Sequence, residues 1–397
     1  MTNEKRLSTN QNFFYDCQMD FGVDLIKPSS KFWFSSRNLT KDEKTKHDYV
    51  HVVSASELSM DDPNLIPTKI NNLSFSIKNR LNDKSTTFKS TNKFLKTEKS
   101  EISSLHTSPL NDIFVTSSNN SVNLYSTKDL KCLKELKDLH KLDINNAKFF
   151  PSGKVLLTAS SDFTLKVTDL EGKVNPIDYF SHKRAVTDTD VVERGTNFIS
   201  SSYDGTVKLW ETATATVMNS VSLSAGKINA ISLEGDFGSK SGNLVFAAAD
   251  EGAFVLDFRS KNLTAPISFQ SNNNSLSLVR SLDVNANNLI AFGCSFGNIV
   301  LYDKRNPKEE LILVKKSKAR INKIKFLKNL ESSLMFSNGE GSLSLVKFSQ
   351  NLDDFNFEKE FIGNDLNSTT FDFFEEEKST IFAGNEIGEL TVFEDFC

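Results

Sequence analysis

Histidine side chains are the first candidates for chemistry in this sequence, because they exchange protons near neutral pH. His182 is a candidate general base, and the alternative is a structural histidine that ties a loop to a neighbouring strand; we favour the structural role. No G-x-S-x-G, H-E-x-x-H or phosphate-binding loop is present, so no catalytic set surrounds it. Metal-ligand spacing is absent from the other histidines, His47, His51, His106 and His140. We therefore expect no enzyme, no cofactor and no metal site.

The composition is that of an ordinary globular protein. Of 397 residues, 38% are hydrophobic and 25% charged, values that disfavour wholesale disorder. The four cysteines lie far apart and form no CxxC pair, the N-terminus lacks the apolar core of a signal peptide, and no apolar run is long enough to span a membrane. These features predict a reducing compartment, cytoplasmic and nuclear, with no membrane partner.

A strand–turn–strand pattern recurs seven times after about residue 100, and its clearest copy is NFISSSYDGTVKLWE from Asn197 to Glu211. Successive copies are 43, 42, 47, 45, 44 and 47 residues apart, measured at Tyr125, Thr168, Trp210, Asp257, Tyr302, Val346 and Phe393. A period of about 40 to 45 residues is typical of one four-stranded propeller blade per repeat. We therefore predict an all-β, seven-bladed β-propeller; a β-sandwich is the alternative that six near-equal intervals disfavour.

The repeat also divides the chain. Residues 1–84 lack it but contain β-like segments such as KFWFSSRNL and LSFSI, so we expect a small β-rich N-terminal domain with a disordered start. Residues 85–397 form the propeller. The last repeat has only three strands, so residues 85–95 are the candidate closing strand that supplies its outer edge. The slight basic excess of the N-terminal segment would let it pack against the acidic propeller.

One copy carries the hallmarks of a known repeat. His182, a serine at Ser200 or Ser202, Asp204 and Trp210 resemble the WD40 pattern, in which such groups form a buried hydrogen-bond network. The longer segment HKRAVTDTDVVERGTNFISSSYDGTVKLWE resembles the proteasomal ATPase-associated factor family. That resemblance implies a yeast-type assembly chaperone of the 26S proteasome regulatory particle base. It would bind the C-terminal domain of a proteasomal ATPase subunit.

Carboxylates recur at the turns between the second and third strands, which open on one face of such a propeller. The predicted partner-binding residues are Asp162, Asp204, Asp250, Glu251, Glu340, Asp365 and Glu386. An acidic face steers a basic partner, although aspartate is also common at turns because it bonds its own backbone. For Asp162 and Asp204 we prefer that structural role; for the three glutamates both roles stay open.

The charge distribution supports a protein partner. Residues 1–97 carry 15 basic and 11 acidic side chains, a net charge of +4, whereas residues 351–397 carry 13 acids and two lysines, a net charge of −11. A field of that sign disfavours nucleic acid. We expect a non-catalytic assembly chaperone that is a monomer on its own. The alternatives are a WD40 scaffold or substrate receptor, such as a ubiquitin-ligase adaptor, and an enzyme with channel carboxylates at Asp188, Asp190 and Asp283.

Overall fold

The computed structural model contains only β-strands as regular elements in the residues that it describes. These are 13–18, 31–38 and 46–396, with gaps at 55–56, 72, 92, 99, 111, 173–175, 235–240, 259–266, 270–275, 277, 286, 331, 363–367 and 375–378. In this part of the chain, no helix is long and apolar enough to span a membrane.

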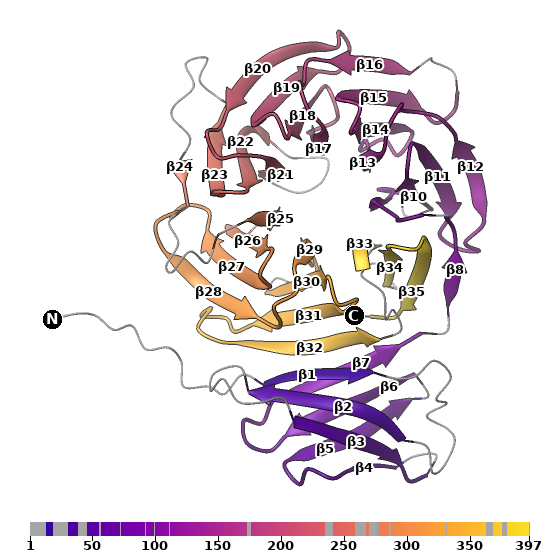
Figure 1. Cartoon of the computed structure of the whole chain (residues 1–397), viewed down its shortest axis with the longest axis vertical. Coiled ribbons are helices and arrows are strands. Elements are labelled where there is room, and N and C mark those ends of the chain that lie inside the picture. Colours follow the sequence, from indigo (N-terminus) through magenta and orange to yellow (C-terminus); the bar gives the residue numbers. More distant parts are fainter. Residues whose placement is uncertain are drawn as a thin grey trace, which may run out of the picture.

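Most strands form sheets arranged in a ring (Figure 1), and the central axis that their inner strands surround is called the channel below. Each sheet runs from an inner strand at the channel to an outer strand at the perimeter. Six of these sheets have four strands. Their strands are β9 (Ser104–Thr107), β10 (Ile113–Ser118), β11 (Ser121–Ser126) and β12 (Cys132–Leu136); β13 (Ile144–Phe149), β14 (Val155–Ser160), β15 (Thr164–Asp169) and β16 (Ile177–Phe180); β17 (Val186–Val192), β18 (Asn197–Ser202), β19 (Thr206–Glu211) and β20 (Thr216–Ser222); β21 (Ile228–Glu234), β22 (Ser241–Ala249), β23 (Gly252–Asp257) and β24 (Ile267–Ser268); β25 (Val279–Val284), β26 (Leu289–Cys294), β27 (Asn298–Asp303) and β28 (Glu310–Lys315); and β33 (Ser368–Phe374), β34 (Thr380–Asn385) and β35 (Glu389–Glu394) with β8 (Phe94–Lys96).

The prediction of seven four-stranded blades beside a small separate N-terminal domain is wrong. The structure has six such blades, and the remaining repeat belongs to a seven-stranded sheet. That sheet contains β29 (Ile321–Phe326), β30 (Ser333–Asn338), β31 (Leu343–Phe348), β32 (Phe355–Ile362), β7 (Ser85–Ser90), β6 (Ser74–Asn79) and β5 (Leu65–Asn71). The cause is a parallel pairing of β7 with β32, which satisfies the open backbone groups of an outer strand and makes the N-terminal strands part of the ring's own sheet.

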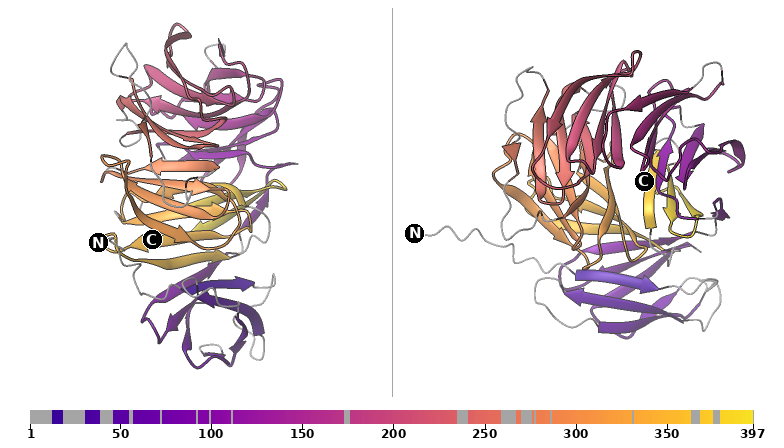
Figure 2. Two further views of the ribbon diagram at one scale, coloured as in Figure 1. Left: turned by 60° about the vertical axis from the view of Figure 1, so that its left-hand side comes forward. Right: turned by 45° about the horizontal axis from the view of Figure 1, so that its top comes forward.

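A second N-terminal sheet covers this extension. It consists of β1 (Phe13–Gln18), β2 (Lys31–Asn38), β3 (Lys46–Val52) and β4 (Leu58–Met60). Figure 2 shows it lying against the extended sheet on the outside of the ring. Val50 and Val52 of β3 pack against Phe75, Phe88 and Ile362. This core therefore joins N-terminal residues to a strand of the last third of the chain.

The outer edge of β35 is completed by residues just before the first repeat. Strand β8 pairs antiparallel with the first half of β35, Leu95 opposite Leu390. Beyond Thr391, the backbone N–H of Val392 donates to the carbonyl of Lys93 (3.0 Å). Side chains add further bonds here: Thr91 donates to the carbonyl of Val392 (2.6 Å), and the Lys89 ammonium donates to the carbonyl of Asp395, just after β35 (2.6 Å). Whether the domain boundary lies at residues 84 and 85 remains a prediction.

Basic residues of the N-terminal segment do meet acidic residues of the ring, as expected from the charge asymmetry. The ammonium of Lys84 lies 2.7 Å from the carboxylate of Asp354, at the end where β7 approaches β32. Both side chains are about one-fifth exposed, at 22% and 21%.

Packing between blades uses the alternation within each strand. In β19, Val207 points toward the next blade and shares a core with Ile231 and Ala247, whereas Trp210 points to the other side and packs with Tyr179 and Phe198. Because successive side chains of a strand face opposite ways, each blade contributes to two interfaces, and the ring is held by apolar contact all the way round.

Candidate functional site

The turns between second and third strands gather on one face of the ring, called the turn face below. In five blades, the first backbone N–H of the turn donates to the carbonyl of the residue just before the inner strand. The pairs are Ser161 to Asp143, Tyr203 to Ala185, Asp250 to Lys227, Ser295 to Leu278 and Gly339 to Arg320. Turns and channel mouth therefore belong to the same surface, as the repeat pattern predicts.

The blade of β17–β20 contains a complete buried polar network. Nδ1 of His182 lies 3.0 Å from the carboxylate of Asp204, and Nε2 lies 2.7 Å from the hydroxyl of Ser200. The indole N–H of Trp210 donates to the same hydroxyl (2.8 Å). Ser202, the other candidate, instead donates to the carbonyl of Arg184. Ser200 is therefore the network serine.

The carboxylate of Asp204 is fully engaged by this network. It accepts hydrogen bonds from the backbone N–H of Lys183 and from the hydroxyl of Thr206 as well as from His182. Burial alone would raise the pKa of Asp204, but these bonds outweigh it and hold the pKa below its ordinary value. The side chain is only 7% exposed, so its chemistry is structural rather than catalytic.

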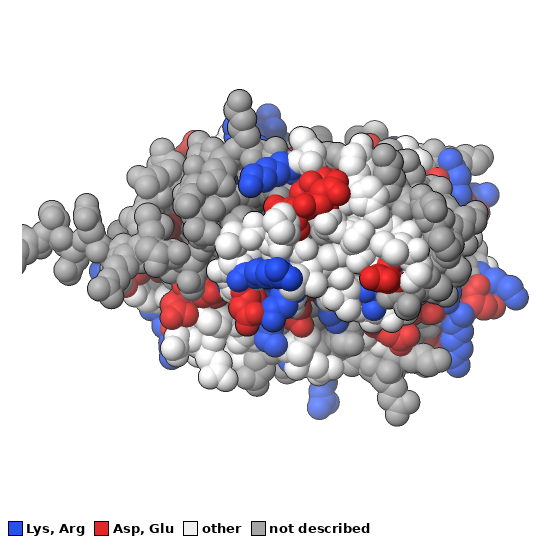
Figure 3. Space-filling model, turned by 90° about the horizontal axis from the view of Figure 1, so that it is seen from below, with Lys and Arg blue, Asp and Glu red and all other residues white. Residues whose placement is uncertain are grey.

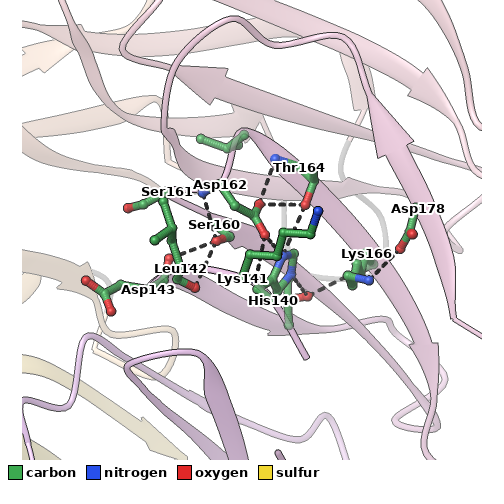
Figure 4. Close-up of polar contacts among 12 residues, drawn as sticks. His140, Lys141, Leu142, Asp143, Ser160, Ser161, Asp162, Thr164, Lys166 and Asp178 are labelled. Atoms are coloured by element: carbon green, nitrogen blue, oxygen red, sulfur yellow. Dashed lines mark hydrogen bonds and ion pairs between the residues drawn. The ribbon is translucent and has the colours of Figure 1, made fainter. Parts of the chain in front are cut away.

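The preceding blade, β13–β16, repeats the arrangement with two substitutions, Thr158 for Ser200 and Thr168 for Trp210; Figure 4 shows His140 and Asp162 of this blade. His140 contacts Asp162 through Nδ1 (3.1 Å) and Thr158 through Nε2 (2.8 Å). Thr168 stands where Trp210 stands, and its buried hydroxyl has no hydrogen-bond partner. The side chain of Asp162 is 8% exposed. Asp162 and Asp204 are therefore both buried in turns rather than presented to a partner.

Glu98 is a network residue that the sequence analysis missed. Its carboxylate accepts from the hydroxyl of Thr116 (2.9 Å) and the amide of Asn123 (2.7 Å), beside the hydroxyl of Tyr125. Glu98 precedes Ile102 by four residues, the spacing that separates His182 from Val186. That spacing is the signal that could have identified it, although the residue type differs from the WD40 pattern.

The remaining predicted carboxylates differ in exposure. Glu251, Glu340 and Glu386 are exposed on the turn face, while Asp250 is partly buried and accepts from the amide of Asn229 (3.0 Å). Asp365 lies outside the described residues. The structure therefore brings three exposed glutamates to one face and leaves their role in binding a prediction.

Basic residues lie on the same face. The sequence analysis predicted its binding residues from the turns alone and did not include them. They lie in the segments that lead into the inner strands. Exposed examples are Lys141, Lys183, Arg184, Lys227, Lys318 and Arg320. The turn face consequently carries charges of both signs, and exposed apolar groups, Leu142, Phe163, Phe296 and Ile387, lie among them. Apolar side chains mixed with charges are typical of protein-binding surfaces.

The described surface at the N-terminal end of the molecule has fewer charged groups than the turn face has around its apolar residues. Figure 3, which views it from below the ring, shows a broad uncharged area with basic and acidic groups side by side among the described residues. Exposed apolar residues of this segment are Tyr49, Val53, Ile70, Leu73 and Leu81. Such a surface offers less electrostatic steering than one with separated charges.

Three aspartates of the inner strands bind the backbone of the neighbouring blade. Carboxylate oxygens of Asp188, Asp190 and Asp283 accept the backbone N–H groups of Ile231, Leu233 and Phe326 in the next blade along, at 3.0, 2.9 and 2.8 Å. An enzymatic propeller would need free carboxylates at these three positions, but here each carboxylate is hydrogen-bonded to the backbone of the next blade. In the described residues, no group of three histidine, cysteine, aspartate or glutamate side chains is placed to hold a metal ion.

Together, the repeated sheets and the two histidine networks define the class of protein: an all-β WD40 β-propeller, as the sequence predicted. Residues 130–169 and 175–211 match the WD40 repeat model (WD domain, G-beta repeat). WD40 propellers are typically non-catalytic scaffolds for protein interactions.

Among known proteins, the chain is 28% identical over 197 residues to the 26S proteasome regulatory subunit RPN14 of Saccharomyces cerevisiae, covering 44% of this chain and 46% of that protein. It is also 35% identical over 101 residues to human pre-mRNA-processing factor 17, covering 23% and 17%. The chain thus matches less than half the length of these relatives.

Two solved structures share the fold at low identity. The structure of U3-55K aligns at a TM-score of 0.63 and 13% identity, covering 74% of this chain and 91% of that one. The crystal structure of the RRP9 WD40 repeats aligns at 0.65 and 13%, covering 76% and 96%. At this identity the likeness concerns the fold alone.

Proposed function

We propose that this chain is a non-catalytic assembly chaperone of the 26S proteasome regulatory particle base, acting in the cytoplasm and nucleus. It would bind the C-terminal domain of one ATPase subunit through the turn face. The observation that carries the proposal is the similarity to RPN14, a proteasome regulatory subunit, over 197 residues. The turn face supplies what a binding platform requires, exposed charge together with exposed apolar side chains.

The primary experiment is a pull-down of the full chain against the C-terminal domains of the six base ATPase subunits. Selective, saturable capture of one domain is the expected result. Capture of none, or equal weak capture of all six, would contradict the proposal.

Electrostatic steering predicts a second result. Replacing Glu251, Glu340 and Glu386 by glutamine removes three negative charges from the turn face, so the association rate constant for a basic domain should fall and depend less on salt. A matched triple of exposed glutamates, Glu171, Glu193 and Glu309, lies in turns at the opposite end of the strands. Replacing these by glutamine should leave both quantities close to wild type. Equal effects of the two triple replacements would show that the turn face does not steer the partner.

A WD40 scaffold subunit of another complex, such as a ubiquitin-ligase adaptor, is the second candidate. The 35% identity to a pre-mRNA-processing factor, higher than that to RPN14 but over a shorter stretch, favours keeping it. Mass spectrometry of proteins that co-purify with the tagged full chain distinguishes the two, because proteasomal ATPase subunits should dominate only under the first.

A further inference from the structure

Side chains at one repeated position bond each inner segment to the next around the channel. We take the inner segment of each blade to begin at Ile102, Ile144, Val186, Ile228, Val279, Ile321 or Ser368. The side chain of the second residue of one inner segment donates to the backbone carbonyl of the first residue of the inner segment in the next blade. Six blades do so: Ser103 to Ile144, Asn145 to Val186, Thr187 to Ile228, Asn229 to Val279, Asn322 to Ser368 and Thr369 to Ile102, at 2.5 to 2.8 Å.

Arg280 breaks this pattern. It occupies the same position in β25, but its Nε donates to the hydroxyl of Ser295 in its own blade (3.0 Å), and it makes no bond to Ile321 of the next blade. The side chain is exposed at the channel mouth. A short polar residue at this position would complete the ring of hydrogen bonds. With arginine there, this blade lacks a hydrogen bond that the other six blades make.

Two further cations lie at the mouth on either side of Arg280. Lys227 precedes β21 and Arg320 precedes β29, and these strands flank β25 around the ring. Both side chains are exposed, and neither forms an ion pair within the described residues. The ammonium of Lys227 lies 5.0 Å from the centre of the Tyr203 ring. Burial raises the pKa of Glu101, and the positive charge of Arg320 opposes that shift, so Arg320 also faces a carboxylate of the chain itself.

We propose that Lys227, Arg280 and Arg320 form a carboxylate-binding arc at the channel mouth, which receives an acidic side chain or chain end of the bound protein partner. This inference rests on the proposed use of the turn face for binding. Guanidinium groups bind carboxylates with two parallel hydrogen bonds. The partner's contact surface would therefore carry an acidic group toward this arc and basic groups toward the turn glutamates, of which Glu251 and Glu340 lie in turns bonded to the segments of Lys227 and Arg320.

Arg280→Asn is the decisive variant, because asparagine already completes the ring at three of the other six positions. We expect it to raise the melting temperature of the full chain by about 2 °C by restoring a donor to Ile321. We also expect it to weaken binding of the captured ATPase domain at least about tenfold. Lys318→Asn removes the same charge from the turn face outside the arc, so it should weaken binding by less than about twofold.

The outcomes separate the two proposals. An unchanged or lower melting temperature of Arg280→Asn would show that the arginine is structural and would overturn the inference. A raised melting temperature with unchanged binding, or equal losses for Arg280→Asn and Lys318→Asn, would overturn the arc and leave the proposed function standing. If the wild-type chain captures none of the ATPase domains, the proposed function fails and the arc fails with it.

Discussion

The ammonium of Lys148 and the carboxylate of Asp190 meet 3.1 Å apart at the boundary between two blades. The other oxygen of Asp190 accepts the backbone N–H of Leu233 in the blade that follows. One carboxylate therefore connects the inner strands β13, β17 and β21. An aspartate that was a candidate for channel chemistry is instead a junction of three blades.

Replacing Asp190 by alanine should lower the free energy of unfolding by about 3 kcal/mol, because Lys148 loses its counter-charge and Leu233 loses an acceptor. Asp190→Asn retains an acceptor and should cost less. Urea unfolding followed by fluorescence measures both. A value for Asp190→Ala within about 0.5 kcal/mol of wild type would show that the junction does not stabilise the ring.

Glu98→Ala should lower the free energy of unfolding by about 2 kcal/mol, because it removes the acceptor of the Thr116 hydroxyl and the Asn123 amide inside one blade. Glu98→Gln keeps an oxygen in the same place and is the matched control. The same urea titration compares the two variants. Equal destabilisation would mean that the negative charge, rather than hydrogen bonding, is what the blade requires.

Closure of the ring should depend on Leu95, whose side chain packs with Phe114 and Leu390. Leu95→Gln should lower the free energy of unfolding by about 2 kcal/mol through loss of apolar burial. Lys96→Gln changes the next residue of β8, which is exposed, and should change stability by less than about 0.5 kcal/mol. Thermal unfolding of both variants tests the pair, and similar melting temperatures would argue against closure through β8.

Stability should fall as the pH drops from about 6.5 toward 3, in part because of His106. Burial, with smaller contributions from nearby lysines, lowers the pKa of His106 to about 3 from 6.5. The unfolded chain therefore takes up a proton in this window that the folded chain refuses, which costs at most about 1.4 kcal/mol per pH unit. The contribution is fully present above pH 6.5.

His106→Gln tests this directly. Unfolding free energies of variant and wild type, each referred to its own value at pH 8, isolate titration from packing. The variant should lose less stability between pH 6.5 and 4. Parallel pH profiles would show that His106 does not govern the acid sensitivity.

The sequence predicted the parts of the fold that repeat and missed those that do not. A 42-residue spacing from Thr168 to Trp210 indicated successive blades, and the resemblance of His182, Ser200 or Ser202, Asp204 and Trp210 to the WD40 pattern predicted their network. The pairing of β7 with β32 joins residues such as Phe88 and Glu360, which are far apart in the chain. The alternation of LSFSI predicts a strand but says nothing about its partner, so a separate domain was expected.

The site was predicted less completely for a physical reason. Turn carboxylates were counted by position, but Asp162 and Asp204 are drawn inward by histidine and backbone donors. Basic residues such as Arg280 and Arg320 lie in and before inner strands, where no turn motif marks them. Only the geometry of the ring brings them to the same face as Glu340.

Pairing the earliest strands with the latest ones also fixes the order of events on the ribosome. Strand β7 gains its partner β32 only when residues 355–362 emerge, and β8 gains its partner β35 only when residues 389–391 do. Synthesis at about 5 to 20 residues per second leaves these edges waiting for roughly 15 to 60 seconds. The nascent chain therefore exposes these two strand edges until residues 355–362 and 389–391 have been synthesised.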